Sequence, residues 1–304
     1  MNRKQFAALA AMTGSSIFGF SFMFSRMALD AASPFVMLMY RFVFAFAAIN
    51  AVALWARRHV QGDGAENWLR FSLRGRDIRP LLALGVVQPV AYFLCESYGI
   101  SLTNSVLSGV IIATAPLAGL AVGIFTLHEI PKKSQVVFSL VSIIGVVLMT
   151  LQQRSEGQVQ ILGIVLLAGA VACGTAFAVI SRKLSGEFSA LERTYVMMLV
   201  AAVTFTTLAL VQNAGDPGVL IAPLKSTGFI MSILYLGIAS SIVAFMALNV
   251  SAGCLPVAQT MSFCNLSTVL SLFAGVIVLH EPFSMVSLFA SVLIIVGIWG
   301  VQRT

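Results

Sequence analysis

The sequence predicts an all-α integral membrane protein with ten transmembrane helices, arranged as two inverted five-helix repeats. Three observations lead to this fold class. The chain of 304 residues is 59% hydrophobic and only 10% charged, whereas a soluble domain has roughly 25% charged residues. The sequence also divides into ten long apolar runs, and its second half repeats motifs of its first half. Lipid must therefore be most of the solvent around this chain.

Each apolar run is long enough for one membrane span, since a spanning helix needs about 20 mostly apolar residues. Prolines mark several of the breaks between runs, among them Pro34, Pro80, Pro131 and Pro282. The first run is too long for the core of a signal peptide, so we interpret it as a retained span. The expected spans are 7–29, 34–56, 80–100, 104–127, 134–151, 161–181, 191–212, 228–249, 256–279 and 283–301.

The internal repeat appears at two fixed offsets along the chain. Residues 119–127 read GLAVGIFTL before His128-Glu129, and residues 271–279 read SLFAGVIVL before His280-Glu281, which is an offset of 152. Further pairs are Gly145 with Gly297 at this offset, and Gly14 with Gly169, Gly19 with Gly174 and Tyr40 with Tyr195 at an offset of 155. Similar halves in an apolar chain are typical of transporters that bind their substrate between repeats. We therefore expect one membrane domain made of repeats over 1–152 and 153–304.

The positive charges predict the orientation, because cytoplasmic segments are enriched in Lys and Arg. With a cytoplasmic N-terminus, three cations would lie outside, namely Arg26, Arg154 and Lys225, and Arg41 would lie within a span. The other fourteen would lie inside: Arg3, Lys4, Arg57, Arg58, Arg70, Arg74, Arg76, Arg79, Lys132, Lys133, Arg182, Lys183, Arg193 and Arg303. Five spans per half is an odd number, so the repeats must be inverted. We expect an integral protein of the cytoplasmic (inner) membrane with both termini in the cytoplasm.

Composition and motifs argue against several classes of function. The net charge of +7 does not indicate nucleic acid, because most cations lie in short breaks between apolar runs. The four cysteines have no paired spacing, and neither His-Glu pair belongs to an HExxH motif. We therefore expect no disulfide framework, no metal and no cofactor. The sequence has no Walker A motif, which argues against ATP-driven pumping.

Short motifs at fixed places in the spans suggest a family. The first half has IFGFSFMFSRMAL at 17–29, Ser33-Pro34, Tyr40-Arg41, Ala115-Pro116-Leu117, Leu127-His128-Glu129 and Gly145, and the second half has Leu279-His280-Glu281 and Gly297. In this combination the chain resembles the EamA family of the drug/metabolite transporter superfamily. Three positions depart from the pattern: Phe18 stands where tryptophan is common, Thr268 replaces Pro116 and Val196 replaces Arg41 in the second half. The resemblance implies a secondary transporter, with exporters of amino acids, including the YddG-like aromatic amino acid exporters, as the nearest kind.

Two charges lie well inside the expected spans, where an unpaired charge costs several kcal/mol. Arg41 is about 10 Å deep from the outer end of the second span, and Glu96 is about 6–10 Å deep from the outer end of the third. Because the depths agree, we expect the two side chains to approach each other or to share a water-filled vestibule. One interpretation is a structural ion pair between two helices. The other is that Glu96 holds a substrate ammonium group or a coupling proton.

Aromatic and hydroxyl side chains complete the candidate substrate site. Tyr92 and Glu96 are four residues apart and share one helix face. The fourth and ninth spans are unusually polar, so we expect them to line a translocation cavity; the alternative is hydrogen bonding between helices without substrate contact. The candidate substrate-binding residues are Phe18, Phe22, Tyr40, Arg41, Tyr92, Glu96, Ser108, Phe177, Tyr195, Tyr235, Gln259 and Ser262.

A second set of residues is a candidate for gating or close helix packing. Gly119 and Gly123 form a GxxxG motif, which allows two helices to approach closely. Pro116 lies in the middle of its span, where a bend could shape or gate the cavity. The full set is Gly19, Pro116, Gly119, Gly123, Glu129, Gly174 and Glu281.

These features favour a secondary transporter for a small organic metabolite that works by alternating access. We expect an exporter of an amino acid, aromatic or otherwise, or of a related compound. The reason is that both apolar and polar side chains are expected to line the cavity, with little net charge. Sugar phosphates fit poorly, because Arg41 is the single deep cation expected to hold phosphate. An intramembrane lipid-modifying enzyme and a passive channel are the alternatives. Proton coupling and the oligomeric state stay open.

Overall fold

Every regular element in the part that the computed structural model describes is a helix, and loops such as 67–78 connect these helices. The structure describes residues 2–60, 67–103, 105–127, 130–151, 160–278 and 284–303. In these ranges nine helical segments are long and apolar enough to cross a membrane. The expected all-α membrane protein is confirmed at this level.

The helices follow the expected spans closely. The first half contains α1 (Arg3–Leu29), α2 (Pro34–His59), α3 (Arg79–Gly85), the π-helical η1 (Val86–Ala91), α4 (Tyr92–Ser101), α5 (Ser105–Ala113), α6 (Ala115–Leu127) and α7 (Lys133–Thr150). The second half contains α8 (Ile161–Leu184), α9 (Ala190–Gln212), α10 (Gly218–Ile221), the 3₁₀ turn η2 (Ala222–Lys225), α11 (Thr227–Leu234), the π-helical η3 (Tyr235–Ala244), α12 (Phe245–Cys254), α13 (Val257–Ser262), α14 (Cys264–Val278) and α15 (Met285–Arg303).

Some spans are built from several helical segments. The third consists of α3, η1 and α4, the eighth of α11, η3 and α12, and the ninth of α13 and α14. The expected fourth span is divided at Thr114 into α5 and α6, and its apolar stretch Ala115–Thr126 is shorter than the nine long segments. Pro116 explains the division, because proline lacks an amide hydrogen and its ring clashes with the carbonyl group four residues earlier.

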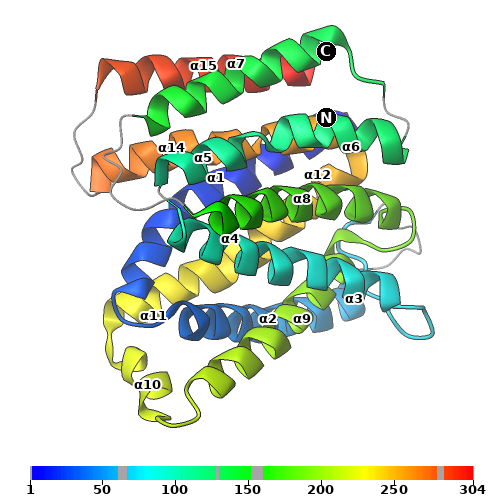
Figure 1. Cartoon of the computed structure of the whole chain (residues 1–304). Helices are drawn as coiled ribbons and strands as arrows, with labels where there is room; N and C mark the ends of the chain where they lie inside the picture. Colours follow the sequence, from blue (N-terminus) through cyan, green and yellow to red (C-terminus); the bar gives the residue numbers. More distant parts are fainter. Residues whose placement is uncertain are drawn as a thin grey trace.

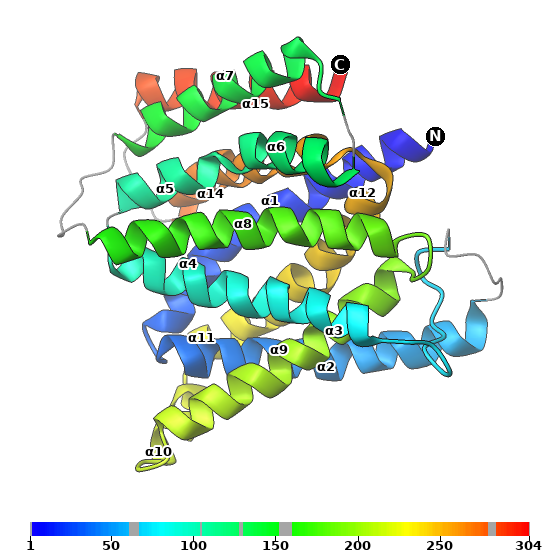
Figure 2. The same cartoon turned by 45° about the vertical axis from the view of Figure 1, so that its right-hand side comes forward.

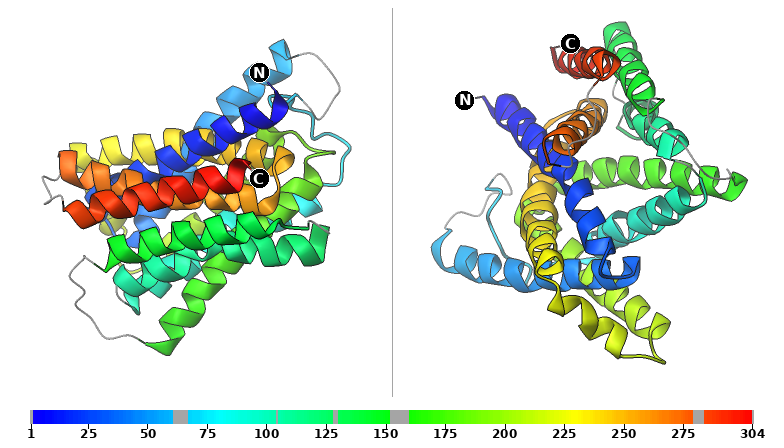
Figure 3. Two further views of the ribbon diagram at one scale, coloured as in Figure 1. Left: turned by 90° about the horizontal axis from the view of Figure 1, so that it is seen from above. Right: turned by 90° about the vertical axis from the view of Figure 1, so that its left-hand side faces the viewer.

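The long helices form one bundle with two distinct edges. α7 and α15 pack against each other at one edge, and α2 packs against α9 at the opposite edge (Figure 1, Figure 3). Between them, α1 packs on α12 and α14, while α8 packs on α4, α5 and α6. α1 begins and α15 ends at the same end of the bundle (Figure 1, Figure 2).

Both the core and the outer surface of this bundle contain many apolar side chains. The main core joins α2, α8, α9 and α12 through the buried rings of Phe42, Phe177, Phe205 and Phe245. Large apolar side chains are also exposed, as for Phe125 at 82% and Ile161 at 80%. An apolar surface of this extent needs lipid around it, so the chain is an integral membrane protein.

Glycines set the contact between α7 and α15. A Cβ atom at Gly145 would lie 2.7 Å from the carbonyl oxygen of Ala290, and one at Gly297 would lie 2.6 Å from the Cβ atom of Ser142. The two glycines that recur at the offset of 152 thus lie in one helix–helix contact. Neither position has space for a side chain, because real Cβ atoms do not approach other atoms this closely.

Candidate functional site

Arg41 lies in the interior of the bundle and bridges α2 to η3. The side chain is 3% exposed. Its Nε donates to the hydroxyl group of Ser241 at 2.9 Å, and its Nη2 donates to that of Ser240 at 2.8 Å. Ser240 and Ser241 are neighbours on one helix, so their side chains point about 100° apart. The guanidinium group still reaches both because its donors form a wide fork.

Aromatic rings cover the faces of the same guanidinium group. The Arg41 Cζ atom lies 4.8 Å from the ring centroid of Phe93 and 5.3 Å from that of Phe42. A cation over an aromatic ring is attracted by the ring quadrupole, and this attraction grows when water is excluded. Serine hydroxyl groups and aromatic rings together compensate a charge that is removed from water.

Glu96 is held by α4 itself. The hydroxyl group of Tyr92, one turn earlier, donates to the Glu96 Oε1 atom at 2.9 Å. Glu96 and Arg41 are near enough to interact electrostatically, but no direct ion pair joins these two described residues. The structure thus brings the two deep charges into one region without joining them. Among the described contacts, Nη1 of Arg41 and Oε2 of Glu96 have no hydrogen-bond partner.

Tyr92 lies against α8. A Cβ atom at Gly174 of α8 would lie 3.7 Å from the Tyr92 ring, so this candidate glycine faces the ring at ordinary contact distance. α4 packs along α8, so Tyr92 lies at the contact between these two helices.

An aromatic cluster joins α1, α8 and α12 deeper in the core. Phe245 makes edge-to-face contacts with Phe18 at 5.4 Å and with Phe177 at 6.4 Å between ring centroids. Such pairs stabilise a core by about 0.5–1.5 kcal/mol beyond their area burial. Phe18 and Phe177 are thus brought together through a third ring. The Phe22 side chain lies outside the described part of the structure.

The other candidate tyrosines use their hydroxyl groups in contacts within the protein. Tyr40 donates to the carbonyl oxygen of Leu220 at 2.9 Å, Tyr195 to Asn50 Oδ1 at 2.9 Å, and Tyr235 to the carbonyl oxygen of Ile17 at 3.0 Å. The ring of Tyr235 also stacks on Phe24 at 4.1 Å. None of the described hydrogen bonds or ring contacts of these three tyrosines involves Arg41 or Glu96.

The polar residues of the fourth and ninth spans lie in two different places. Ser108 of α5 is hydrogen-bonded to Thr103 at 2.8 Å. Gln302 at the end of α15 donates from Nε2 to the carbonyl oxygen of Gln259 at 2.8 Å and to the Ser262 hydroxyl group at 3.0 Å. Gln259 and Ser262 therefore lie together on the α15 side of α13.

The candidate gating and packing residues lie at helix contacts where they are described. A Cβ atom at Gly19 would lie 2.7 Å from Leu270 of α14, and one at Gly119 would lie 3.0 Å from Met261 of α13. Pro116, Gly123 and Gly174 belong to α6 or α8, and the first two are buried. Glu129 and Glu281 lie outside the described residues.

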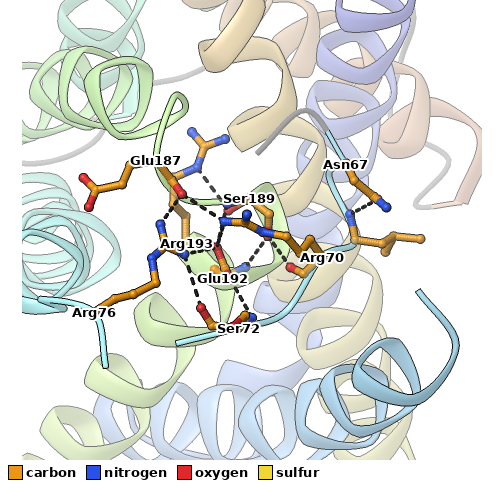
Figure 4. A network of polar contacts seen from close by, with 9 residues as sticks. Asn67, Arg70, Ser72, Arg76, Glu187, Ser189, Glu192 and Arg193 are labelled. Atoms are coloured by element: carbon orange, nitrogen blue, oxygen red, sulfur yellow. Dashed lines mark hydrogen bonds and ion pairs between the residues drawn. The ribbon is translucent and has the colours of Figure 1, made fainter. Parts of the chain in front are cut away.

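A polar network that the sequence did not reveal ties the loop after α2 to the start of α9 (Figure 4). Glu192, whose side chain is fully buried, accepts hydrogen bonds from the backbone of Ser72 at 2.7 Å and of Ser189 at 2.8 Å. It also forms ion pairs with Arg76 at 3.2 Å and Arg70 at 3.7 Å. We call these five residues the Glu192 network. Ser189 and Glu192 form the capping box that starts α9, which is the one part of the network that sequence spacing can indicate.

Sequence reasoning also missed Phe93, Phe245, Ser240 and Ser241. The adjacent serines in an apolar run are the signal that could have found the partners of Arg41. Among the described residues, no group of three His, Cys, Asp or Glu side chains could hold a metal ion.

The fold and this interior pair of charges are typical of a membrane transporter. Comparison with known families supports this class: the sequence pattern of the EamA-like transporter family matches residues 5–151 and 161–303. The chain belongs to that family, as the resemblance in its motifs implied. The chain is also 28% identical over 297 residues to the uncharacterized transporter YcxC of Bacillus subtilis (strain 168), covering 97% of this chain and 92% of that protein. One solved crystal structure superposes with a TM-score of 0.80 at 18% identity over 99% of each chain, which shows a shared fold.

Proposed function

We propose that this protein is a secondary transporter that exports an amino acid, or a similar zwitterion, by alternating access. Two polar atoms of opposite charge in the membrane interior support the proposal. They are Arg41 Nη1 and Glu96 Oε2, and neither has a hydrogen-bond partner among the described contacts. A substrate carboxylate would bind the first, and a substrate ammonium group the second. Charge-assisted hydrogen bonds of both kinds are about twice as strong as neutral ones.

The surroundings fit a substrate that is apolar beyond its zwitterionic end. Tyr92 and Phe93 provide aromatic surface beside the two charges, since Tyr92 is hydrogen-bonded to Glu96 and Phe93 lies against the Arg41 guanidinium group. Arg193 is the other buried arginine of the described spans, but it donates to Ser181 and Ser189 instead. One available guanidinium nitrogen suits a carboxylate better than a phosphate with two negative charges. Amino acids therefore fit better than sugar phosphates.

We also propose that α5 and α6 together form one interrupted span, which gives ten spans in two inverted repeats. The family pattern matches the two halves separately, at 5–151 and 161–303. The helix contacts of the two halves correspond as well, if α8 is the counterpart of α1. α1 packs on α12 and α14 of the second half, and α8 packs on their counterparts in the first half, which are α4 and the α5–α6 pair. α1 and α8 begin at opposite ends of the bundle (Figure 2), as inversion requires.

In this proposal both termini are cytoplasmic, and the protein lies in the inner membrane. The fourteen-to-three distribution of cations supports this orientation. At the same end of the bundle, α6 contacts α13 at Gly119 and Met261. In this orientation we propose that the contact closes the cytoplasmic end, and that alternating access requires it to separate.

Counterflow in proteoliposomes tests the transport proposal. Labelled amino acids, nucleosides and sugar phosphates should be compared, each with and without a pH gradient. We expect saturable counterflow that amino acids compete for, and strongly reduced uptake in Glu96→Gln. Glu187→Gln is the matched control, since its carboxylate is exposed on the loop before α9. Preference for sugar phosphates would overturn the substrate class, and pH dependence unchanged by Glu96→Gln would remove Glu96 from proton coupling.

The same assay separates the other classes of protein. A passive channel would show flux without saturation or counterflow, and an intramembrane enzyme would form product from labelled lipid. Accessibility of cysteines introduced near each terminus tests the orientation. Termini on opposite sides would contradict an arrangement with an even number of spans.

A further inference from the structure

A pocket of about 550 Å³ with both polar and apolar lining residues lies at the end of the bundle where the chain begins and ends. The start of α1, α6, the start of α7, the start of α13 and the end of α15 form its walls, and the ends of α1 and α15 lie near the two termini (Figure 2). The lining residues include Lys4, Lys132 and Arg303, and the polar side chains of Gln5, Gln135, Gln259 and Gln302. This pocket is separate from Arg41 and Glu96.

The three cations of the pocket have no acidic partner among the described residues. Every described lining residue is neutral or positively charged. Glutamines bond to the protein itself: Gln302 of α15 donates to the carbonyl oxygen of Gln259 of α13 at 2.8 Å, and Gln135 Oε1 accepts from the backbone of Lys132 at 3.1 Å, within the start of α7. The three cations come from the start of α1, the residue before α7 and the end of α15, and all are exposed, so an anion that enters the pocket can reach each of them and offset their mutual repulsion.

The rim of the pocket is suited to lipid. Ile130, which lines the pocket, is 92% exposed, and Trp299 on α15 is 55% exposed. The Arg303 guanidinium group lies 4.9 Å from the centroid of the Trp299 ring. Tryptophan is enriched at the membrane–water interface, so this end of α15 lies at the level of the lipid headgroups. Basic pockets between membrane helices at this level favour anionic headgroups.

We propose that this pocket binds the headgroup of an anionic phospholipid, with its phosphate between Lys4, Lys132 and Arg303. The acyl chains would follow the exposed apolar side chains of α7 and α15, such as Ile144 and Val292. A bound lipid would join the outer α7–α15 pair to α1 and α13, where the described glutamine bonds join only α15 to α13. The inference goes beyond the proposed transport function and does not depend on the identity of the substrate.

Lipid retention by the purified full-length protein is the test. The protein is loaded with phosphatidylglycerol or phosphatidylcholine, washed in detergent, and the bound lipid is counted by native mass spectrometry. We expect the wild type to retain phosphatidylglycerol preferentially. The triple variant Lys4→Gln, Lys132→Gln and Arg303→Gln should lose about fivefold in affinity per cation, roughly a hundredfold in all. If the triple variant retained as much phosphatidylglycerol as the wild type, the proposal would be overturned.

Two further variants keep the test specific. The matched triple Arg57→Gln, Arg58→Gln and Lys183→Gln removes exposed cations from the last turns of α2 and α8, outside the pocket, and should retain phosphatidylglycerol. Ala8→Phe fills the pocket without changing its charge and should also lose the lipid. Unchanged binding in Ala8→Phe, or an equal loss in the matched triple, would overturn the pocket as the site.

A soluble competitor distinguishes a lipid from a free anion. Glycerophosphoglycerol, the deacylated headgroup of phosphatidylglycerol, carries the same phosphodiester without acyl chains, and we expect it to displace phosphatidylglycerol only at far higher concentration. Displacement at equal concentration would overturn a lipid occupant in favour of a soluble phosphate. Because the readout is bound lipid, failure of the transport proposal leaves this result unaffected.

Discussion

Arg41 donates a hydrogen bond of 2.8 Å from Nη2 to the hydroxyl group of Ser240, which lies 199 residues further along the chain. With the bond to Ser241, this contact ties a helix of the first half to a helix of the second half. The two bonds engage Nε and Nη2 of the guanidinium group and leave Nη1 for the proposed substrate carboxylate. The geometry of one buried arginine thus couples helix packing to the proposed recognition of a carboxylate.

We predict that the double variant Ser240→Ala, Ser241→Ala destabilises the protein and weakens substrate binding. Two donors of a buried cation would lose their partners, at a cost of about 1–3 kcal/mol each. Thermal unfolding in detergent measures the first effect and counterflow the second. Ser139→Ala is the matched control, because the buried Ser139 hydroxyl group has no hydrogen-bond partner. Equal melting temperatures for the double variant and the control would contradict the role of the serines.

Tyr92→Phe is predicted to weaken substrate binding while leaving the fold intact. The ring that packs near Gly174 remains, but Glu96 loses the 2.9 Å hydrogen bond that orients it. A hydrogen bond to a charged group contributes about 1.5–3 kcal/mol, so we expect at least a tenfold rise in the half-saturation concentration for counterflow. Tyr98→Phe, on the exposed side of α4, should change nothing. An unaltered affinity in Tyr92→Phe would show that Glu96 is oriented in another way.

Hydropathy and charge were sufficient to predict the helical membrane fold, because apolar runs of about 20 residues have few alternatives in lipid. Arg41 and Glu96 could be found in the same way, since charges at that depth are rare. Their partners could not. Many serines in helices hydrogen-bond to a carbonyl group of their own helix, and sequence does not distinguish Ser240 from these. Only the three-dimensional packing shows that Ser240 is a partner of Arg41.

The polar stripe of the ninth span shows the same limit. Gln259 and Ser262 were expected to line a translocation cavity; the structure places both against Gln302 of α15, and Gln259 also lines the pocket near the two termini. Periodicity identifies the residues that share a helix face, but it does not identify the helix that this face meets. The interruption at Thr114 was foreseeable only as a bend at Pro116, because sequence alone does not separate a kinked span from a broken one.

Gly19 and Gly174 recur at an offset of 155, yet we predict that they tolerate alanine differently. A Cβ atom at Gly19 would lie 2.8 Å from the carbonyl oxygen of Ser267, so α1 and α14 would have to separate. At Gly174 the nearest atom would be 3.7 Å away, in the Tyr92 ring. We expect Gly19→Ala to cost about 1–3 kcal/mol and Gly174→Ala to leave the melting temperature close to that of the wild type. If Gly174→Ala lowered the melting temperature more than Gly19→Ala, the α1–α14 contact would be looser than in the structure.

Glu192→Gln is predicted to release the segment 67–79 from the start of α9 without affecting the substrate site. The carboxylate accepts two backbone hydrogen bonds and pairs with Arg70 and Arg76. An amide nitrogen would face these donors instead of an oxygen. Breaking a buried ion pair costs about 3–5 kcal/mol, so local opening should increase at least a hundredfold. Limited trypsin digestion reports this opening, because Arg70, Arg74 and Arg76 lie in the segment.

The control for this last variant is Glu187→Gln, five residues earlier, where the backbone carbonyl group rather than the carboxylate accepts from Arg70 and Arg76. Cleavage of Glu187→Gln should therefore match that of the wild type, while counterflow affinity should be the same in all three proteins. Slow cleavage of Glu192→Gln would mean that Phe188, whose ring lies 4.0 Å from the Arg76 guanidinium carbon, holds the segment in place by itself. A loss of counterflow affinity would instead connect the Glu192 network to Arg41, because α9 packs directly against α2.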